Sequence, residues 1–348
     1  MTIHPSFRYN GVALAQDQWK PWLHEKLASS PEWEFLHIRF MLDWLNDNDF
    51  IEVQTSGSTG IPKMWKVSKS AMLASAFLTA KHFNCLSGTT ALLNLSSSFI
   101  AGKMMLARAM SQGWNLTAIE PTAQPLESVQ HAYDFAAFTP MQLALLTPQQ
   151  LQHLGRFGVV IVGGAAVSSS LCQSLSALGN TIYETYGMAE TLSHVAVRRI
   201  QLEPVPFHAI GEITFSVDEQ SRLQIHAAHL SSDMLQTQDV VSLIDDVSFY
   251  YLGRYDRVIN SGGIKLFAEA IEFKLATVLQ QPFAVTSHPD EVLGERVVVY
   301  IESKSIPDED VLRERMRFVL ERYEMPKEIV AVAALERTTS GKIKQIKK

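Results

Sequence analysis

Apolar residues follow two patterns along this chain, and the patterns alternate over much of its length. Apolar positions three and four residues apart predict helices, whereas short continuous apolar runs predict buried strands. Such alternation is typical of parallel sheets with crossover helices. The patterns predict helices over 19–27, 32–45, 68–83, 103–110 and 168–178 and one starting at 140, and strands over 52–54, 90–94, 115–119 and 159–162.

The pattern changes twice in the second half of the chain. Short strands and turns after Gly211 predict a small antiparallel or barrel-like part, and a mixed unit follows Arg254. We therefore expect an α/β fold: a large N-terminal domain at 1–254 with mixed, largely parallel sheets, then a small mobile α+β domain at 255–348. The later elements are strands over 212–215, 223–227, 247–252, 283–286 and 297–302, and helices over 267–279 and 308–323.

Composition and charge narrow the class of partner. With 348 residues and 47% hydrophobic residues the chain can build a substantial core, and its formal net charge of -6 argues against nucleic acid or anionic membrane as partners. Small molecules are the expected partners. Cys85 and Cys172 have no metal-ligand spacing. With no signal-peptide pattern and no apolar run of about 20 residues, the sequence predicts a cytoplasmic protein without membrane insertion.

A stretch rich in hydroxyls and glycines lies between the strand at 52–54 and the helix at 68–83. Glycines let backbone N–H groups approach an anion, hydroxyls add donors, and a lysine supplies a point charge. Strand, loop and helix in this order is the setting of a phosphate-binding loop. The stretch reads Thr55, Ser56, Gly57, Ser58, Thr59, Gly60, Ile61, Pro62, Lys63.

Other interpretations of this loop are weaker. A solvated Ser/Thr/Gly connection has a similar composition, but nine such residues closed by Pro62-Lys63 favour phosphate. A Walker loop needs four residues between its first glycine and Gly-Lys, and here a proline stands directly before Lys63. The dinucleotide fingerprint Gly-x-Gly-x-x-Gly is also missing from the sequence. The loop therefore predicts a site for the phosphates of ATP that is neither a Walker loop nor a dinucleotide-binding loop.

Three further motifs follow the phosphate loop in order. They are the segment 183–191 (Tyr-Glu-Thr-Tyr-Gly-Met-Ala-Glu-Thr), Asp239 with 253–256 (Gly-Arg-Tyr-Asp), and 338–342 (Thr-Thr-Ser-Gly-Lys). Together with the loop they resemble the adenylate-forming superfamily of acyl-CoA ligases, nonribosomal peptide adenylation domains and luciferases. The resemblance covers about residues 50 to 348. It implies that ATP activates a carboxylate to an acyl-adenylate, whose acyl group is then transferred, commonly to the thiol of CoA.

The resemblance also implies roles for single residues. The loop Thr55 to Lys63 wraps the β- and γ-phosphates, and Glu190 holds the Mg²⁺ that bridges phosphate oxygens. Lys342 approaches the bridging oxygens and the attacking carboxylate, where an ammonium offsets developing negative charge. Tyr186 offers a flat face for adenine, and Gly164 and Ala165 lie against adenine and the acyl group. Asp239 and Arg254 reach the ribose, and Gly187, Met188 and Ala189 also contact the nucleotide.

In this superfamily the small domain rotates between the two half-reactions. The hinge position matches Asp256, and Gly262 and Gly263 would line the tunnel for the pantetheine of CoA. Each residue alone has an ordinary alternative: Glu190 as a surface carboxylate, or Lys342 as part of a solvated basic tail. Their motifs favour the functional interpretation.

Departures from the common pattern point to the substrate. Ala189 stands where threonine is frequent, and Phe99 occupies a position that often gates the acyl site. The chain carries only 54 residues before the loop, which suggests a domain shortened at its N-terminus. The short N-terminus, together with the segments 99–105, 190–196 and 260–265, is similar to compact 2-succinylbenzoate–CoA ligases of menaquinone biosynthesis.

A substrate with an aromatic ring and two carboxylates needs apolar walls and a cation or several donors for the carboxylate that does not react. Lys103, His194 and Arg198 are the candidates, although surface charge or a packed histidine explains them equally well. Two alternatives stay open: a ligase for another aryl or short-chain acid, and a non-catalytic acyl-adenylate or nucleotide binding protein. The expected small molecules are the acid, ATP, Mg²⁺ and CoA.

Overall fold

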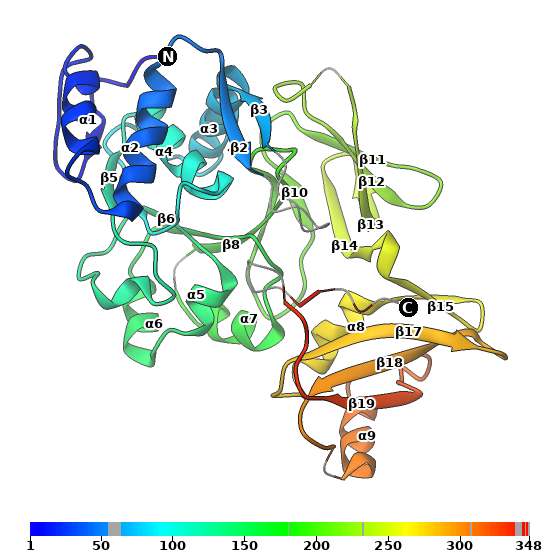
Figure 1. The fold of residues 1–348 in the computed structure, drawn as a ribbon. Helices are drawn as coiled ribbons and strands as arrows, with labels where there is room; N and C mark the ends of the chain where they lie inside the picture. The colour runs from blue at the N-terminus through cyan, green and yellow to red at the C-terminus, as the bar shows by residue number, and fades with distance from the viewer. Residues whose placement is uncertain are drawn as a thin grey trace. The chain divides into compact units, whose positions relative to one another are not determined.

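The computed structural model describes residues 1–54, 64–179, 181–231, 233–306, 308–337, 343, 344 and 346. The chain forms two compact units (Figure 1). Unit 1 comprises Met1–Val167, Leu171–Thr214 and His226–Met234; unit 2 comprises Ser168–Ser170, Phe215–Ile225 and Leu235–Lys348. The domain boundary after Arg254 stays a prediction. Among the described residues, no helix has both the length and the apolar character needed to cross a membrane.

A largely parallel sheet forms the centre of unit 1, as the alternating pattern predicts. Its order is β1-β5-β4-β6-β7-β8-β9-β10, with parallel pairs up to β8 and antiparallel pairs after it. The strands are β1 (Arg8–Tyr9), β4 (Thr90–Leu93), β5 (Asn115–Ala118), β6 (Phe135–Phe138), β7 (Val159–Val162), β8 (Thr181–Gly187), β9 (His194–Arg199) and β10 (Phe207–Ala209).

Helices cover both faces of this sheet. Successive residues of a strand point to opposite faces, and both faces of these strands carry apolar side chains that helices bury. Leu93 packs into one core with α3 and α4, whereas its neighbour Leu92 packs into a second core with α5, α6 and α7. Figure 1 shows these two groups of helices on opposite sides of the sheet. The helices are α1 (Trp19–Leu27), α2 (Glu32–Leu45), α3 (Lys69–His82), α4 (Ile100–Gln112), α5 (Pro140–Ala144), α6 (Pro148–Leu154) and α7 (Ser169–Ser176), with a 3-10 turn at Pro125–Glu127.

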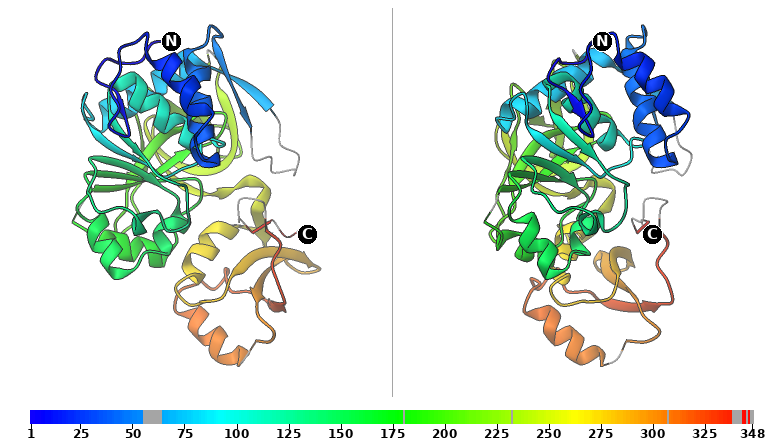
Figure 2. Two further views of the ribbon diagram at one scale, coloured as in Figure 1. Left: turned by 60° about the vertical axis from the view of Figure 1, so that its left-hand side comes forward. Right: turned by 90° about the vertical axis from the view of Figure 1, so that its left-hand side faces the viewer.

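Local sequence explains where several of these helices begin and end. Thr139 and Thr147 close capping boxes before α5 and α6, each followed by a proline at the first helical position. The hydroxyl of Ser68 accepts a hydrogen bond from the backbone N–H of Ala71 at the start of α3. Gly113 ends α4 in the left-handed conformation, with φ of 74°. Figure 2 shows α1 and α2 side by side at the N-terminal end of unit 1.

A separate antiparallel hairpin frames the predicted phosphate loop. Strands β2 (Phe50–Gln54) and β3 (Met64–Ser68) pair so that Gln54 lies opposite Met64. The two ends of the segment 55–63 are therefore held next to each other, while the segment itself lies outside the described residues. The predicted strand over 52–54 is confirmed as the end of β2. The sequence pattern did not predict β3.

Unit 2 contains two antiparallel sheets. The first has the order β14-β13-β12-β11; the second has the order β16-β15-β18-β17, with β19 parallel to β18. The second packs with α8 and α9 around a core of its own. The elements are β11 (Thr214–Val217), β12 (Arg222–His226), β13 (Leu235–Asp245), β14 (Ser248–Arg254), a 3-10 turn at Tyr255–Arg257, β15 (Val258–Ser261), β16 (Ile264–Phe267), α8 (Ala268–Leu275), β17 (Phe283–Asp290), β18 (Gly294–Glu302), α9 (Glu309–Arg317) and β19 (Glu328–Val332).

Most predicted elements are confirmed in kind, and the main error concerns α9. The predicted helix over 308–323 is wrong at its end, since α9 stops at Arg317. The chain then turns so that Leu320 enters the core at 7% exposure while Phe318 stays 84% exposed.

Candidate active site

A rigid turn after β8 presents the Tyr-Gly-Met-Ala-Glu motif. The Thr191 hydroxyl donates to the carbonyl of Ser193 at 2.7 Å and accepts from the backbone N–H of Met188 at 2.8 Å. Leu192, next in the chain, has a positive φ of 63°, which bulky residues adopt only in constrained turns. Glu190 is exposed on this turn. The arrangement offers a carboxylate on a fixed backbone.

Gly187 lies where β8 approaches β9 too closely for a side chain. A Cβ added there would lie 2.8 Å from the Cα of His194 and against the carbonyl oxygen of Ser193. Both are backbone atoms, which cannot move aside independently. The glycine is therefore required for the close approach.

We expect Gly187→Ala to lower the free energy of unfolding by about 1–3 kcal/mol, the usual cost of overpacking. Gly179→Ala is the matched control, because a Cβ there has no described neighbour within 4 Å. Thermal unfolding of both variants measures the difference. An equal effect at the two positions would show that the contact with β9 does not constrain Gly187.

The segment after β7 supplies a second exposed stretch in unit 1. Gly164 and Ala165 are exposed, and Gly164 has a φ of 88° that suits glycine. The buried Val167 ends the stretch, and its backbone N–H donates to Oε1 of Glu184 at 3.3 Å. The ring of Tyr186, two residues after Glu184, is 9% exposed and lies 5.8 Å from the ring of Phe207.

Of the three predicted partners for a substrate carboxylate, two already have strong partners. Arg198 pairs with Glu184 at 2.6 Å, and its guanidinium lies 4.4 Å from the Phe207 ring centroid. His194 is buried, Nε2 lies 3.2 Å from the Thr79 hydroxyl, and desolvation lowers its pKa well below the ordinary value, which keeps the imidazole neutral. Their assignment to the acid stays a prediction.

The third candidate and the predicted gate lie at the start of α4. Phe99 precedes its first residue and is 55% exposed. The Lys103 ammonium lies 5.6 Å from the Phe40 ring centroid, and burial lowers its pKa. Both remain candidates for the acyl site.

Arg108, which no sequence motif predicts, is the most unusual charged residue of unit 1. It is 2% exposed, and no described carboxylate lies within ion-pair distance of its guanidinium. Nη2 donates to the Ser193 hydroxyl, Nη1 lies 3.7 Å from Sδ of Met105, and Nε has no hydrogen-bond partner among the described residues. Burial lowers its pKa to about 10, so it stays charged near neutral pH. The sequence feature that could have identified Arg108 is its position inside the apolar run Met104 to Met110.

In unit 2, a cross-strand pair joins two of the predicted nucleotide ligands. Asp239 on β13 lies opposite Arg254 at the end of β14, with 3.7 Å between Oδ1 and Nη1. Arg254 also donates to both carboxylate oxygens of Asp256, at 3.2 and 3.3 Å. Asp239 is 7% exposed, whereas Asp256 at the predicted hinge is half exposed. Asp239 and Arg254 are thus at ion-pair distance, and the hydrogen bonds of the Arg254 guanidinium go to Asp256.

Gly262 and Gly263 form the two-residue turn between β15 and β16, in which Ser261 lies opposite Ile264. Their φ values of 59° and 80° fit a type I′ hairpin turn, which needs glycine-like residues at both positions. The turn alone explains these two residues, and their role toward CoA stays a prediction. The loop Thr55 to Lys63 and Lys342 lie outside the described residues.

The donor set suits Mg²⁺ bound together with a nucleotide. The described residues contain no group of three His, Cys, Asp or Glu side chains that could hold a metal alone. Mg²⁺ is usually held by one or two carboxylates with substrate phosphates and waters. The exposed Glu190 can supply one such carboxylate.

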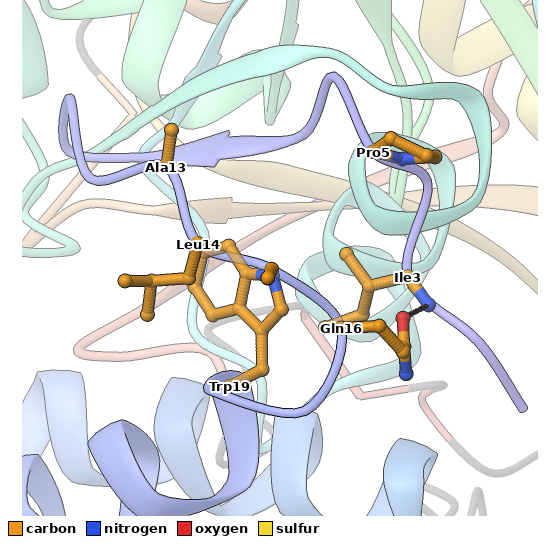
Figure 3. A pocket seen from close by; sticks show the side chains of 7 residues that line it. Ile3, Pro5, Ala13, Leu14, Gln16 and Trp19 are labelled. Carbon is orange, nitrogen blue, oxygen red and sulfur yellow. Dashed lines mark hydrogen bonds between the residues drawn. The ribbon is translucent and has the colours of Figure 1, made fainter.

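A shallow pocket of about 340 Å³ lies beside the start of α1 (Figure 3). It is lined mainly by apolar side chains, and Gln16 Oε1 accepts a hydrogen bond from the backbone N–H of Ile3 at 2.8 Å. None of its described lining residues titrates. The pocket therefore offers no side chain for proton transfer or for neutralising phosphate charge.

Comparison with known proteins places these features in a family. Residues 20–221 match the AMP-binding enzyme family, and residues 281–342 match the AMP-binding enzyme C-terminal domain. A probable 2-succinylbenzoate–CoA ligase of Mycobacterium tuberculosis is 26% identical over 86% of this chain and 83% of its own length. The 2-succinylbenzoate–CoA ligase of Staphylococcus aureus is 24% identical over 84% of this chain, which spans 65% of that protein.

Solved structures agree with this assignment. An acyl-CoA synthetase (AMP-forming)/AMP-acid ligase II-like protein from Dyadobacter fermentans is 34% identical, with a TM-score of 0.62 over 93% of this chain and 95% of that chain. The o-succinylbenzoate CoA synthetase of Bacillus subtilis with its acyl-adenylate intermediate shares the fold, at 17% identity and a TM-score of 0.73 over 84% of this chain and 67% of that chain. This chain belongs to the AMP-binding enzyme family, the adenylate-forming superfamily that its motifs resemble.

Proposed function

We propose that this member of the adenylate-forming CoA ligases activates 2-succinylbenzoate and produces 2-succinylbenzoyl-CoA for menaquinone biosynthesis. In the first step a substrate carboxylate attacks the α-phosphorus of ATP, the acyl-adenylate forms and pyrophosphate leaves. In the second step the thiol of CoA attacks the acyl carbon, the thioester forms and AMP leaves. The names of the relatives in M. tuberculosis and S. aureus support this substrate.

The candidate site residues would have different roles in the formation of the acyl-adenylate. In unit 1, Tyr186 and the segment at Gly164 would take the adenine, and Glu190 would hold Mg²⁺, which when bound neutralises charge on the phosphate oxygens. In unit 2, Asp239, at ion-pair distance from Arg254, would accept hydrogen bonds from the ribose hydroxyls. Positive charge on the phosphates would come from the loop Thr55 to Lys63 and from Lys342.

The observation that carries the choice of acid is the buried guanidinium of Arg108. A buried charge without a counter-ion is costly, so a protein retains one where a ligand supplies the opposite charge. The Ser193 hydroxyl accepts from Arg108, and its oxygen also lies 3.3 Å from Nδ1 of His194. Ser193 is half-buried and lies three residues after Glu190. A dicarboxylate whose second carboxylate reaches Ser193 would come within one hydrogen bond of the guanidinium.

A substrate panel tests this proposal directly. We expect ATP-dependent pyrophosphate release with 2-succinylbenzoate, and AMP and a CoA thioester as products once CoA is added. Benzoate lacks the second carboxylate, malonate lacks the ring and acetate lacks both. Each should give a rate lower by about 100-fold, the size of effect expected when a charged hydrogen bond is left unmade. Equal or faster release with another acid would reassign the substrate, and no release with any acid would indicate a nucleotide binding protein.

A further inference from the structure

One ion pair is linked through neighbouring residues to both segments of unit 1 that we assign to adenine. Glu184 on β8 lies opposite Arg198 on β9 in the antiparallel register. Nε and Nη2 of Arg198 reach Oε2 of Glu184 at 2.8 and 2.6 Å. The side chains are 9% and 24% exposed, so solvent screens the pair only weakly.

The carboxylate end of this pair holds the segment after β7. Oε1 of Glu184, the oxygen that Arg198 leaves available, accepts from the backbone N–H of Val167 at 3.3 Å. Val167 is 4% exposed, whereas Gly164 and Ala165 just before it are exposed. The exposed segment is thus fixed at its C-terminal end by a charge-assisted hydrogen bond.

The guanidinium end of the pair supports Tyr186. Cζ of Arg198 lies over the Phe207 ring, 4.4 Å from its centroid, as in a cation–π contact. The Phe207 ring in turn packs against the Tyr186 ring at 5.8 Å and an interplanar angle of 57°. A continuous set of contacts therefore runs from Val167 to the Tyr186 ring.

We propose that the Glu184–Arg198 pair is a positioning device that sets the Gly164–Ala165 segment and the Tyr186 ring in register for an adenine base. It determines nucleotide affinity and the preference for adenine over other bases, a role for Arg198 that replaces its predicted contact with the acid. The inference rests on the proposed function only in assigning adenine to these two segments. Preorganising both segments lowers the ordering cost of nucleotide binding.

Arg198→Lys is the informative variant, because lysine keeps the charge but loses the two-nitrogen contact and the flat stacking surface. We expect ATP and AMP to bind about tenfold more weakly, measured by calorimetry on the full chain without acid. The preference for ATP over GTP in pyrophosphate release should narrow by the same factor. The KM for the acid and kcat at saturating ATP should stay within about twofold of wild type.

Arg313→Lys is the matched control. Arg313 also contacts a glutamate through Nε and Nη2, at 2.8 and 2.7 Å from Glu309, but on α9 in unit 2. The Arg313→Lys substitution should leave nucleotide binding unchanged. If Arg198→Lys fails to show a cooperative thermal transition, the double variant Glu184→Gln with Arg198→Gln removes both charges together and should show the same loss of adenine preference.

Two results would overturn the inference. One is unchanged ATP binding in a folded Arg198→Lys or double variant. The other is a loss of the same size for ATP, GTP and acid, as general destabilisation would produce. The first result is measured without acid, so it does not depend on whether 2-succinylbenzoate is the substrate, which the wild-type panel decides separately. The second result is measured with whichever acid that panel identifies.

Discussion

Lys342→Ala is expected to slow ATP-dependent pyrophosphate release by about 100- to 1000-fold, the cost typical of removing one donor aimed at developing charge. The lysine stands in the Thr-Thr-Ser-Gly-Lys motif, which by resemblance approaches the attacking carboxylate and the bridging oxygens. Its ammonium would act only while the phosphoanhydride breaks. Thioester formation from supplied acyl-adenylate and CoA should therefore keep its wild-type rate, measured by chromatography of the thioester.

Lys344→Ala provides the comparison within the same basic tail. The Lys344 ammonium lies 3.3 Å from Oε2 of Glu336, and both side chains are exposed, so this pair should contribute little. We expect both half-reactions to be unaffected. Equal loss of the two half-reactions in Lys342→Ala would contradict the assignment of this lysine to the adenylation step.

Periodicity alone predicts much of unit 1. Helices α1 and α2 begin and end at the predicted residues, and strand β7 has the predicted bounds. Their apolar residues recur at the spacing of a helix or form a short continuous run, as in a buried strand. Strands β8 and β9 were not predicted. A charged residue, Glu184, occupies a buried position of β8 and breaks its apolar alternation, and the apolar part of β9 is short.

The contacts that define the candidate site depend on that hairpin. Glu184 and Arg198 face each other only when β9 folds back on β8, and the register cannot be fixed before the turn is known. Arg108 meets Ser193 across 85 positions of sequence, through the packing of α4 against the sheet. Sequence motifs identify the residues predicted to contact the nucleotide. The residues that hold those residues in place can be identified only from the tertiary structure.

Arg108→Met is expected to reduce kcat/KM for 2-succinylbenzoate by about 100-fold, which corresponds to the roughly 3 kcal/mol that a desolvated charged hydrogen bond contributes. The same change should leave the melting temperature unchanged or higher, because methionine replaces a buried charge that no described carboxylate neutralises. Loss of activity without loss of stability distinguishes a ligand-binding residue from a structural one. Thermal unfolding and pyrophosphate release on the same preparation measure both.

Two monoacids make the test specific to the second carboxylate. 4-Oxo-4-phenylbutanoate lacks the ring carboxylate of 2-succinylbenzoate, and 2-butanoylbenzoate lacks the chain carboxylate. Wild type should use the monoacid that keeps the reacting group about 100-fold less well than the diacid. Arg108→Met should use that monoacid as well as wild type does, since a substrate without the second carboxylate has no group for the guanidinium to bind. Arg39→Met, which removes an arginine with 62% exposed side chain from α2, should preserve the preference for the diacid. If Arg108→Met lowered the rates with monoacid and diacid alike and also lowered the melting temperature, Arg108 would be a structural residue, and another cation would have to bind the second carboxylate.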